Sequence, residues 1–181
     1  MKKGNTVGTY RKTFQLDEGW KDREVFLNFE AVESAFYLWV NGQPVGYSED
    51  SFTRAEFDIT PYLQEGENTI AVQVYRWSDG SWLEDQDFLR LPGIFRDVYL
   101  TSKDAAEIRD FKVETDLDEE YKDAELSVET SLRKFKDVEG ADYKVKAQLF
   151  DAEGNEVKVE GLEAAVSFEG EEAEVTLKRC V

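Results

Sequence analysis

The dipeptide Asn41-Gly42 stands between two short apolar runs, and it constrains the fold more than any other feature of the sequence. The runs are residues 35–40 (AFYLWV) and residues 44–47 (PVGY). Asn and Gly readily adopt the positive φ angles that a tight two-residue turn needs, so Asn-Gly between apolar runs favours an antiparallel hairpin. A chain built around such a hairpin belongs to a class with antiparallel sheets.

Strand patterns continue on both sides of this hairpin. Phe36 and Leu38 alternate with Tyr37 and Trp39, so we expect the two pairs to lie on opposite faces of a sheet. No helical apolar spacing extends over three turns. We therefore predict an all-β chain, with strands in its first part at residues 9–16, 25–31, 35–40, 44–47, 56–59 and 69–77.

The composition changes near residues 101–107 and predicts two domains, 1–103 and 104–181. The first part has 17 acidic and 11 basic residues and all four tryptophans, whereas the second has 23 acidic and 11 basic residues. Six strand patterns follow in the second part, at residues 108–115, 124–132, 143–150, 157–159, 164–168 and 173–177. Their spacing is typical of an immunoglobulin-like sandwich, which has about seven strands, so we expect an incomplete one.

Charge and composition exclude several classes of function. A net charge of −18 argues against nucleic acid and anionic membranes as partners. The absence of histidine removes Ser-His-Asp and Cys-His catalysis and every histidine metal site, so any chemistry would rest on carboxylates. Cys180 is the only cysteine, and no secretion signal precedes the first strand pattern, so we expect a cytoplasmic protein.

The stretch RWSDGSWLEDQDF, residues 76–88, raises the question of a catalytic pair. Asp85 and Asp87 are two residues apart, which in an extended chain puts both carboxylates on one face about 6–7 Å apart, near the spacing used by glycosidases. A working pair needs one raised pKa, created by an apolar pocket around one of the two acids. An exposed acidic loop offers no such asymmetry. We therefore expect no catalysis by this pair, and expect Asp85 to cap a turn or to pair with Arg90 or Arg96.

Three other features admit a functional and a structural interpretation. Trp77 and Trp82 could stack on sugar rings, but core packing and loop anchoring are commoner roles for aromatic side chains, and we favour them. The acidic residues 116–120 lack the glycine and the spacing of a calcium loop and are expected to form a solvated turn. Cys180 is not expected to be a reactive thiol.

Four segments within residues 8–100 resemble, in order, the sugar-binding domain of glycoside hydrolase family 2, and more narrowly its large bacterial β-galactosidases. They are GTYRKTF, FYLWVNGQPVGYSEDSFTRAEFDITPYL, GENTIAVQVYRWSDGSWLEDQD and PGIFRDVYL. Residues 104–181 resemble, by position and pattern, the immunoglobulin-like domain that follows in the family. The resemblance implies a jelly-roll, galactose-binding-domain-like sandwich followed by an immunoglobulin-like β-sandwich, both incomplete.

The resemblance also implies a role. Family members are retaining enzymes whose two catalytic glutamates lie on a later (β/α)8 barrel of about 250 residues, for which this chain has no room. We therefore expect an inactive region that completes the pocket for terminal β-galactosides such as lactose and braces the barrel. The second aspartate of LEDQD, Asp87, matches the family's pocket aspartate beside a bound sodium ion. Asp79 and Glu49 match ligands of a structural magnesium ion, and Asn5 does not correspond to the family's other pocket residue.

The expected partners follow from this role. They are the catalytic barrel of a parent enzyme, a β-galactoside only in that context, and a second copy of the chain, since incomplete sandwiches expose strand edges that favour self-association. Two alternatives stay open: a free-standing carbohydrate-binding module, and a structural or interaction β-sandwich without a ligand. Exposed aromatics on one face would favour the binding module, whereas a bare apolar surface would favour the fragment.

Overall fold

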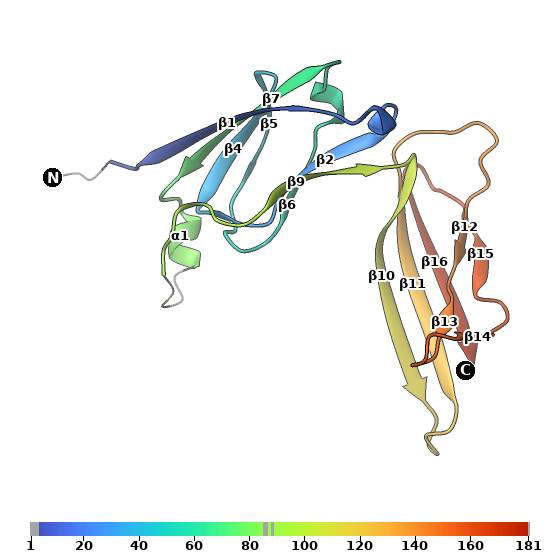
Figure 1. Cartoon of the computed structure of the whole chain (residues 1–181). Helices are drawn as coiled ribbons and strands as arrows, with labels where there is room; N and C mark the ends of the chain where they lie inside the picture. Colours follow the sequence, from blue (N-terminus) through green and yellow to red (C-terminus); the bar gives the residue numbers. More distant parts are fainter. Residues whose placement is uncertain (1–3, 85–86, 88, 181) are drawn as a thin grey trace. The chain divides into compact units, whose positions relative to one another are not determined.

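The computed structural model describes residues 4–84, 87 and 89–180. Strands make up most of the described chain, and the only α-helix among the described residues is a single turn, α1 (Gly80–Leu83). The chain divides into two compact units, Met1–Lys103 and Asp104–Val181 (Figure 1). The prediction of an all-β chain is confirmed.

The first unit is a sandwich of two antiparallel sheets (Figure 1). The four-stranded sheet has the order β1 (Val7–Gln15), β7 (Glu67–Tyr75), β4 (Ala35–Val40), β5 (Gln43–Ser48). The three-stranded sheet has the order β6 (Ala55–Asp58), β2 (Glu24–Phe29), β9 (Val98–Lys103). A short pair, β3 (Val32–Glu33) with β8 (Gly93–Ile94), and two 3-10 turns, η1 (Glu18–Trp20) and η2 (Thr60–Tyr62), complete the unit.

The core of this unit lies between the two sheets. Leu27 and Phe29 of β2 face Leu38 and Val40 of β4, and all four side chains are at most 1% exposed. The alternation predicted for β4 is confirmed, because its even-numbered residues are buried whereas Tyr37 is 43% exposed on the opposite face. Alternation along the strand therefore decides which residues form the core.

The predicted hairpin forms at the predicted place. Asn41 (φ 51°) and Gly42 (φ 79°) both have positive φ, which a tight turn between right-twisted strands requires. The turn places Tyr37 opposite Tyr47 in the β4–β5 register.

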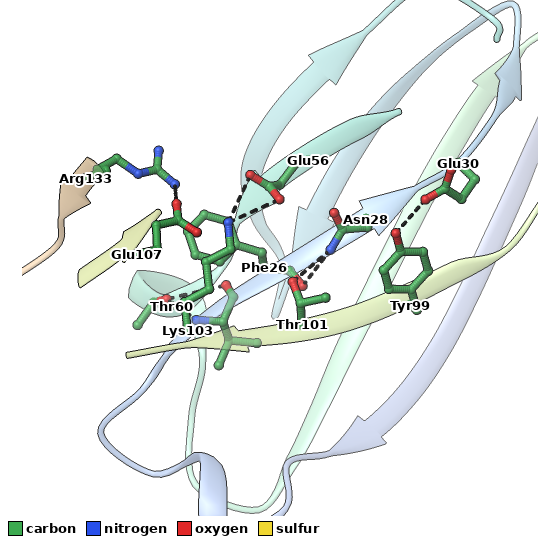
Figure 2. Close-up of polar contacts among 11 residues, drawn as sticks. Phe26, Asn28, Glu30, Glu56, Thr60, Tyr99, Thr101, Lys103, Glu107 and Arg133 are labelled. Atoms are coloured by element: carbon green, nitrogen blue, oxygen red, sulfur yellow. Dashed lines mark hydrogen bonds and ion pairs between the residues drawn. The ribbon is translucent and has the colours of Figure 1, made fainter. Parts of the chain in front are cut away.

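The outer face of the three-stranded sheet carries its own polar contacts (Figure 2). Lys103 of β9 pairs with Glu56 of β6 at 3.4 Å, and its ammonium group lies 4.2 Å from the ring centre of Phe26. The Tyr99 hydroxyl donates to Glu30 at 2.5 Å. These contacts pair most of the charged groups of this face, whereas the buried Oδ1 of Asn28 has no partner among the described residues.

The second unit is built on a three-stranded antiparallel sheet with the order β10 (Ala106–Leu117), β11 (Ala124–Lys134), β16 (Glu172–Cys180). Two strand pairs accompany it: β12 (Lys144–Lys146) with β15 (Glu163–Ala165), and β13 (Leu149–Phe150) with β14 (Glu156–Val157). Its core joins Leu126 and Leu132 of β11 to Val145 of β12 and Leu177 of β16.

One predicted strand is divided in this unit. Residues 143–150 were expected to form a single strand, but they break between β12 and β13 because the two halves pair with different strands. At the break, the amide of Ala147 donates to the carbonyl of Leu162 at 2.8 Å. Apolar alternation runs through the break unchanged, so the alternation alone could not reveal it.

Candidate functional site

The candidate site is the segment between β7 and β8, which contains α1 and lies at one end of the first unit (Figure 1). The single turn of α1 is closed locally, because the amide of Ser78 donates to the Ser81 hydroxyl at 3.0 Å and the amide of Glu84 donates to the Gly80 carbonyl at 2.9 Å. The chain then passes through residues 84–92 before it enters β8. The acidic motif thus lies in the connection between β7 and β8.

Side chains from elsewhere fix the start of this connection. Asn5 donates from Nδ2 to the Trp77 carbonyl at 2.6 Å and accepts from the Trp77 amide at 3.0 Å. The guanidinium carbons of Arg76 and Arg90 each lie 5.4 Å from the centre of the Trp77 ring. Trp77 is 44% exposed, so the expected core packing is wrong, whereas its contacts with Arg76 and Arg90 fit the loop anchoring expected beside it.

Trp82 behaves differently from Trp77. Its side chain is 82% exposed on α1, so the prediction that it packs is wrong. The buried residues of α1 are Gly80 and Ser81, and the local sequence contains no signal that Trp82 is left exposed. The exposed indole remains available as a contact surface.

Asp87 is exposed and has a positive φ of 54°, a conformation that aspartate tolerates better than most residues. Asp85, its expected neighbour, lies outside the described residues. The predicted absence of a catalytic pair therefore stays a prediction, as do the substrate and sodium roles of Asp87. Among the described residues no three acidic or cysteine side chains converge here, whereas an ion site needs several oxygen ligands.

The two residues predicted to bind magnesium lie in one neighbourhood. The Tyr47 hydroxyl donates to Glu49, and partial burial, this hydrogen bond and the charges of Glu49 and Asp79 together raise the pKa of Tyr47 above its ordinary value. A Cβ at Gly80 would lie 3.3 Å from the Ser78 hydroxyl oxygen and 3.5 Å from Glu49 Oε2.

These oxygens suit a hard cation that binds through one or two carboxylates and keeps several waters, as Mg²⁺ does. The Ser78 oxygen is buried and has no hydrogen-bond partner among the described residues. Nowhere in residues 4–84, 87 and 89–180 do three acidic or cysteine side chains converge as a metal site would require. The fit is thus that of a partial site with two carboxylates, and the magnesium assignment remains a prediction.

Large apolar side chains flank Asp87 on both sides along the chain. Trp82 and Leu83 precede it and Leu89 and Leu91 follow it, and all four are at least 65% exposed. Exposed apolar residues on this scale usually mark a surface that contacts another part of a protein.

The other sequence candidates lie away from this segment. Residues 118–123 form an exposed turn between β10 and β11, in which the amide of Lys122 donates to Asp118 at 2.9 Å. Cys180 is exposed at the end of β16, with a free thiol. Within the described part of the chain, no helix is long and apolar enough to cross a membrane.

Sequence inspection missed several supports of the segment. Asn5 and Glu33 support it from outside any recognisable motif, and Glu84 stands in the acidic motif but nothing there indicates its contact with Ser51. Of these residues, Glu33 could best have been recognised from the sequence as a support. It is the only acidic residue between positions 31 and 48, within a strongly apolar stretch.

Comparison with known proteins places these features in a family. The glycosyl hydrolases family 2 sugar binding domain matches residues 1–104, and a second glycosyl hydrolases family 2 domain matches residues 106–179. The β-galactosidase of Priestia megaterium is 57% identical over 155 residues, which is 86% of this chain. The β-galactosidase of Clostridium acetobutylicum is 46% identical over 155 residues, also 86% of the chain.

The chain spans 15% and 17% of the lengths of these two relatives. Among solved structures, a β-glucuronidase of Bacteroides uniformis has a TM-score of 0.78 at 23% identity, over 97% of this chain and 22% of that one. At this identity the likeness concerns the fold alone. The sandwich units, the segment between β7 and β8 and the matched sequences together show that the chain belongs to glycosyl hydrolases family 2.

Proposed function

We propose that the chain is a non-catalytic N-terminal region of a retaining β-galactosidase. In this proposal, it completes the pocket for terminal β-galactosides through Asp87 and packs against the catalytic barrel. The observation that carries the proposal is the exposed apolar group, Trp82, Leu83, Leu89 and Leu91, on both sides of Asp87. A surface of this kind suits contact with the remainder of a longer enzyme.

The chemistry of Asp87 in this role is hydrogen bonding. Its carboxylate would accept hydrogen bonds from a sugar hydroxyl and contribute one ligand to a sodium ion, with the other ligands coming from the barrel. Glu49 and Asp79 would hold magnesium with water completing its shell. A hydrogen bond to a charged group contributes roughly 1.5–3 kcal/mol, whereas millimolar affinity requires about 4.1 kcal/mol. Asp87 alone is therefore too weak to capture galactose.

This reasoning gives a first test on the chain by itself. We expect no hydrolysis of a chromogenic β-galactoside, and a dissociation constant for galactose in sodium buffer that is weaker than millimolar and unchanged by Asp87→Ala. Calorimetric titration measures the constant. A micromolar constant that Asp87→Ala abolishes would contradict the proposal.

A chimera tests the role in the longer enzyme. This chain would replace the matching segment of the Priestia megaterium β-galactosidase, to which it is 57% identical over 155 residues. We expect Asp87→Ala to raise KM for a β-galactoside by about tenfold to a hundredfold, because the charged hydrogen bond is lost. Asp116→Ala, at an exposed position of β10, is the control. An active chimera with the same KM in both variants would exclude contact between Asp87 and the substrate.

A specific observation favours a second candidate, a carbohydrate-binding module. The outer face of the four-stranded sheet carries Tyr37, and the rings of Trp39, Tyr47 and Tyr75 lie 4.7–6.0 Å from it. Aromatic rings on a sheet face can stack on sugar rings. Micromolar binding of an oligosaccharide by the chain alone, lost in Tyr37→Ala, would support this candidate over the first.

A further inference from the structure

Glu33 is a buried carboxylate with one backbone partner. It is 7% exposed at the end of β3, and its Oε2 accepts a hydrogen bond from the amide of Leu91 at 2.6 Å. Burial of a carboxylate is costly unless hydrogen bonds compensate for the lost water. This contact ties β3 to the chain just after the segment that carries Asp87, across 58 positions of sequence.

Arg90 connects the end of the same segment to α1. Its Nη2 donates to the carbonyl of Ser81 at 2.6 Å, and its guanidinium carbon lies 5.4 Å from the ring centre of Trp77. The Arg90 side chain therefore binds directly to Ser81, nine positions earlier in the chain.

A third contact holds the chain just after α1. Both carboxylate oxygens of Glu84 lie 3.3 Å from the amide of Ser51. Glu33, Ser51, Ser81, Glu84 and Arg90 together line a cavity of about 10 Å³, which is room for about one water molecule. The Ser51 hydroxyl oxygen is buried there without a protein partner among the described residues. The two described ends of the segment thus meet around a small polar cavity, where Glu33 and Ser51 bind them.

We propose that Glu33 is a positioning residue that fixes the place of Asp87. Glu33 binds the Leu91 amide and so ties Leu91 to β3. The neighbouring Arg90 side chain binds the Ser81 carbonyl and so ties the same part of the chain to α1. Asp87 lies between the two anchored ends along the chain, with a positive φ of 54°. The effect of Glu33 on substrate binding rests on the proposed function of Asp87, whereas the anchoring of the chain at Leu91 does not.

Tryptic cleavage of the Arg90–Leu91 bond reports the anchoring directly. Trypsin must extract the Arg90 side chain and extend the backbone at Leu91, and both are bound in the intact chain. We expect Glu33→Ala to speed this cleavage about tenfold or more. Glu33→Gln keeps an acceptor oxygen and should restore most of the protection. The matched control is Glu30→Ala, which removes the Tyr99 contact in the same unit and leaves the segment alone.

Unchanged cleavage in Glu33→Ala, or equal acceleration in Glu30→Ala, would overturn the proposal. If Glu33→Ala does not fold, hydrogen exchange of the Leu91 amide in Glu33→Met, which fills similar space without an acceptor oxygen, takes its place. Exchange faster than in the unsubstituted chain, with neighbouring strand amides unchanged, is the expected result, and unchanged exchange at Leu91 would contradict it.

The chimera with the Priestia megaterium enzyme separates anchoring from function. We expect Glu33→Ala to raise KM by a factor approaching that of Asp87→Ala, with partial rescue in Glu33→Gln and no change in Glu30→Ala. The double variant Glu33→Ala/Asp87→Ala should have the same KM as Asp87→Ala, because both substitutions act on the same contact, that between Asp87 and the substrate. If Asp87→Ala alone raises KM, the positioning role of Glu33 fails. If neither raises KM while cleavage still accelerates, the anchoring stands and the proposed role of Asp87 fails.

Discussion

At the scale of single residues, Asn68 shows how much one buried amide can organise. It is fully buried, and its Oδ1 accepts from Asn41 Nδ2 at 2.8 Å and from the Gln64 amide at 2.9 Å. Its Nδ2 donates to the carbonyls of Gln64 at 3.0 Å and Gly66 at 3.2 Å. The amide therefore binds the turn before β7 to the β4–β5 hairpin.

We predict that Asn68→Ala lowers the free energy of unfolding of the first unit by about 2–4 kcal/mol, because it leaves buried backbone groups unsatisfied. Urea unfolding followed by tryptophan fluorescence measures the loss. The control is Gln43→Ala, at an exposed hairpin position, which should cost under about 0.5 kcal/mol. Equal losses in the two variants would contradict this role.

Tyr47 gives a pH-dependent prediction at the same scale. Partial burial, the hydrogen bond to Glu49 and the nearby carboxylate charges raise the pKa of Tyr47 in the folded chain. Its contribution to stability is therefore complete below the ordinary tyrosine pKa of about 10 and is lost as pH rises through the folded value. We expect Glu49→Gln to lower the pKa of Tyr47 toward its ordinary value. An ultraviolet titration, corrected with Tyr47→Phe, measures this, and no difference between the two backgrounds would refute the coupling.

At the scale of elements, the β4–β5 hairpin depends on two glycines for different reasons. Gly42 has a positive φ of 79° and open space around it, so it serves the turn. At Gly46, a Cβ would lie 2.7 Å from a ring carbon of Phe57, so this position serves packing between β5 and β6. The Phe57 ring is in turn packed against Phe29 and Phe36.

We predict that Gly46→Ala destabilises the first unit by about 1–3 kcal/mol through overpacking, and Gly42→Ala by about 1–2 kcal/mol through backbone strain. The two causes can be separated with Phe57→Leu. This change should offset part of the cost of Gly46→Ala and none of the cost of Gly42→Ala. Thermal unfolding measures the three single and the two double variants, and additive effects at Gly46 and Phe57 would rule out the packing explanation.

The same hairpin shows what the sequence could predict. Its turn and the faces of β4 follow from local chemistry, Asn-Gly and alternation, which act over a few residues. The division of residues 143–150 and the exposure of Trp82 depend on which distant segments lie alongside, and local patterns do not contain that information. Family membership could be predicted from the four quoted segments. The supports of the Asp87 segment could not, because Asn5, Glu33 and Ser51 meet it only in the folded chain.

At the scale of the whole molecule, the two units have separate cores that differ in how completely their side chains are buried. The buried core residues of the first unit are at most 4% exposed, whereas those of the second are 3–9% exposed. The second part also has 23 acidic against 11 basic residues, compared with 17 against 11 in the first. A thinner core and stronger self-repulsion both lower the stability of the second unit.

We therefore predict that residues 104–181 unfold before residues 1–103 on heating. All four tryptophans lie in the first unit, so tryptophan fluorescence reports only that unit, whereas circular dichroism reports both. The first dichroism transition should precede the fluorescence transition. Raising the salt concentration from about 0.01 M to 0.1 M shortens the screening length from about 30 Å to 10 Å. It should therefore shift the early transition upward by more than the late one. Residues 1–103 expressed alone are the control and should keep the fluorescence midpoint. A single transition that both probes report at one temperature would show that the two units unfold together, against the separate cores described here.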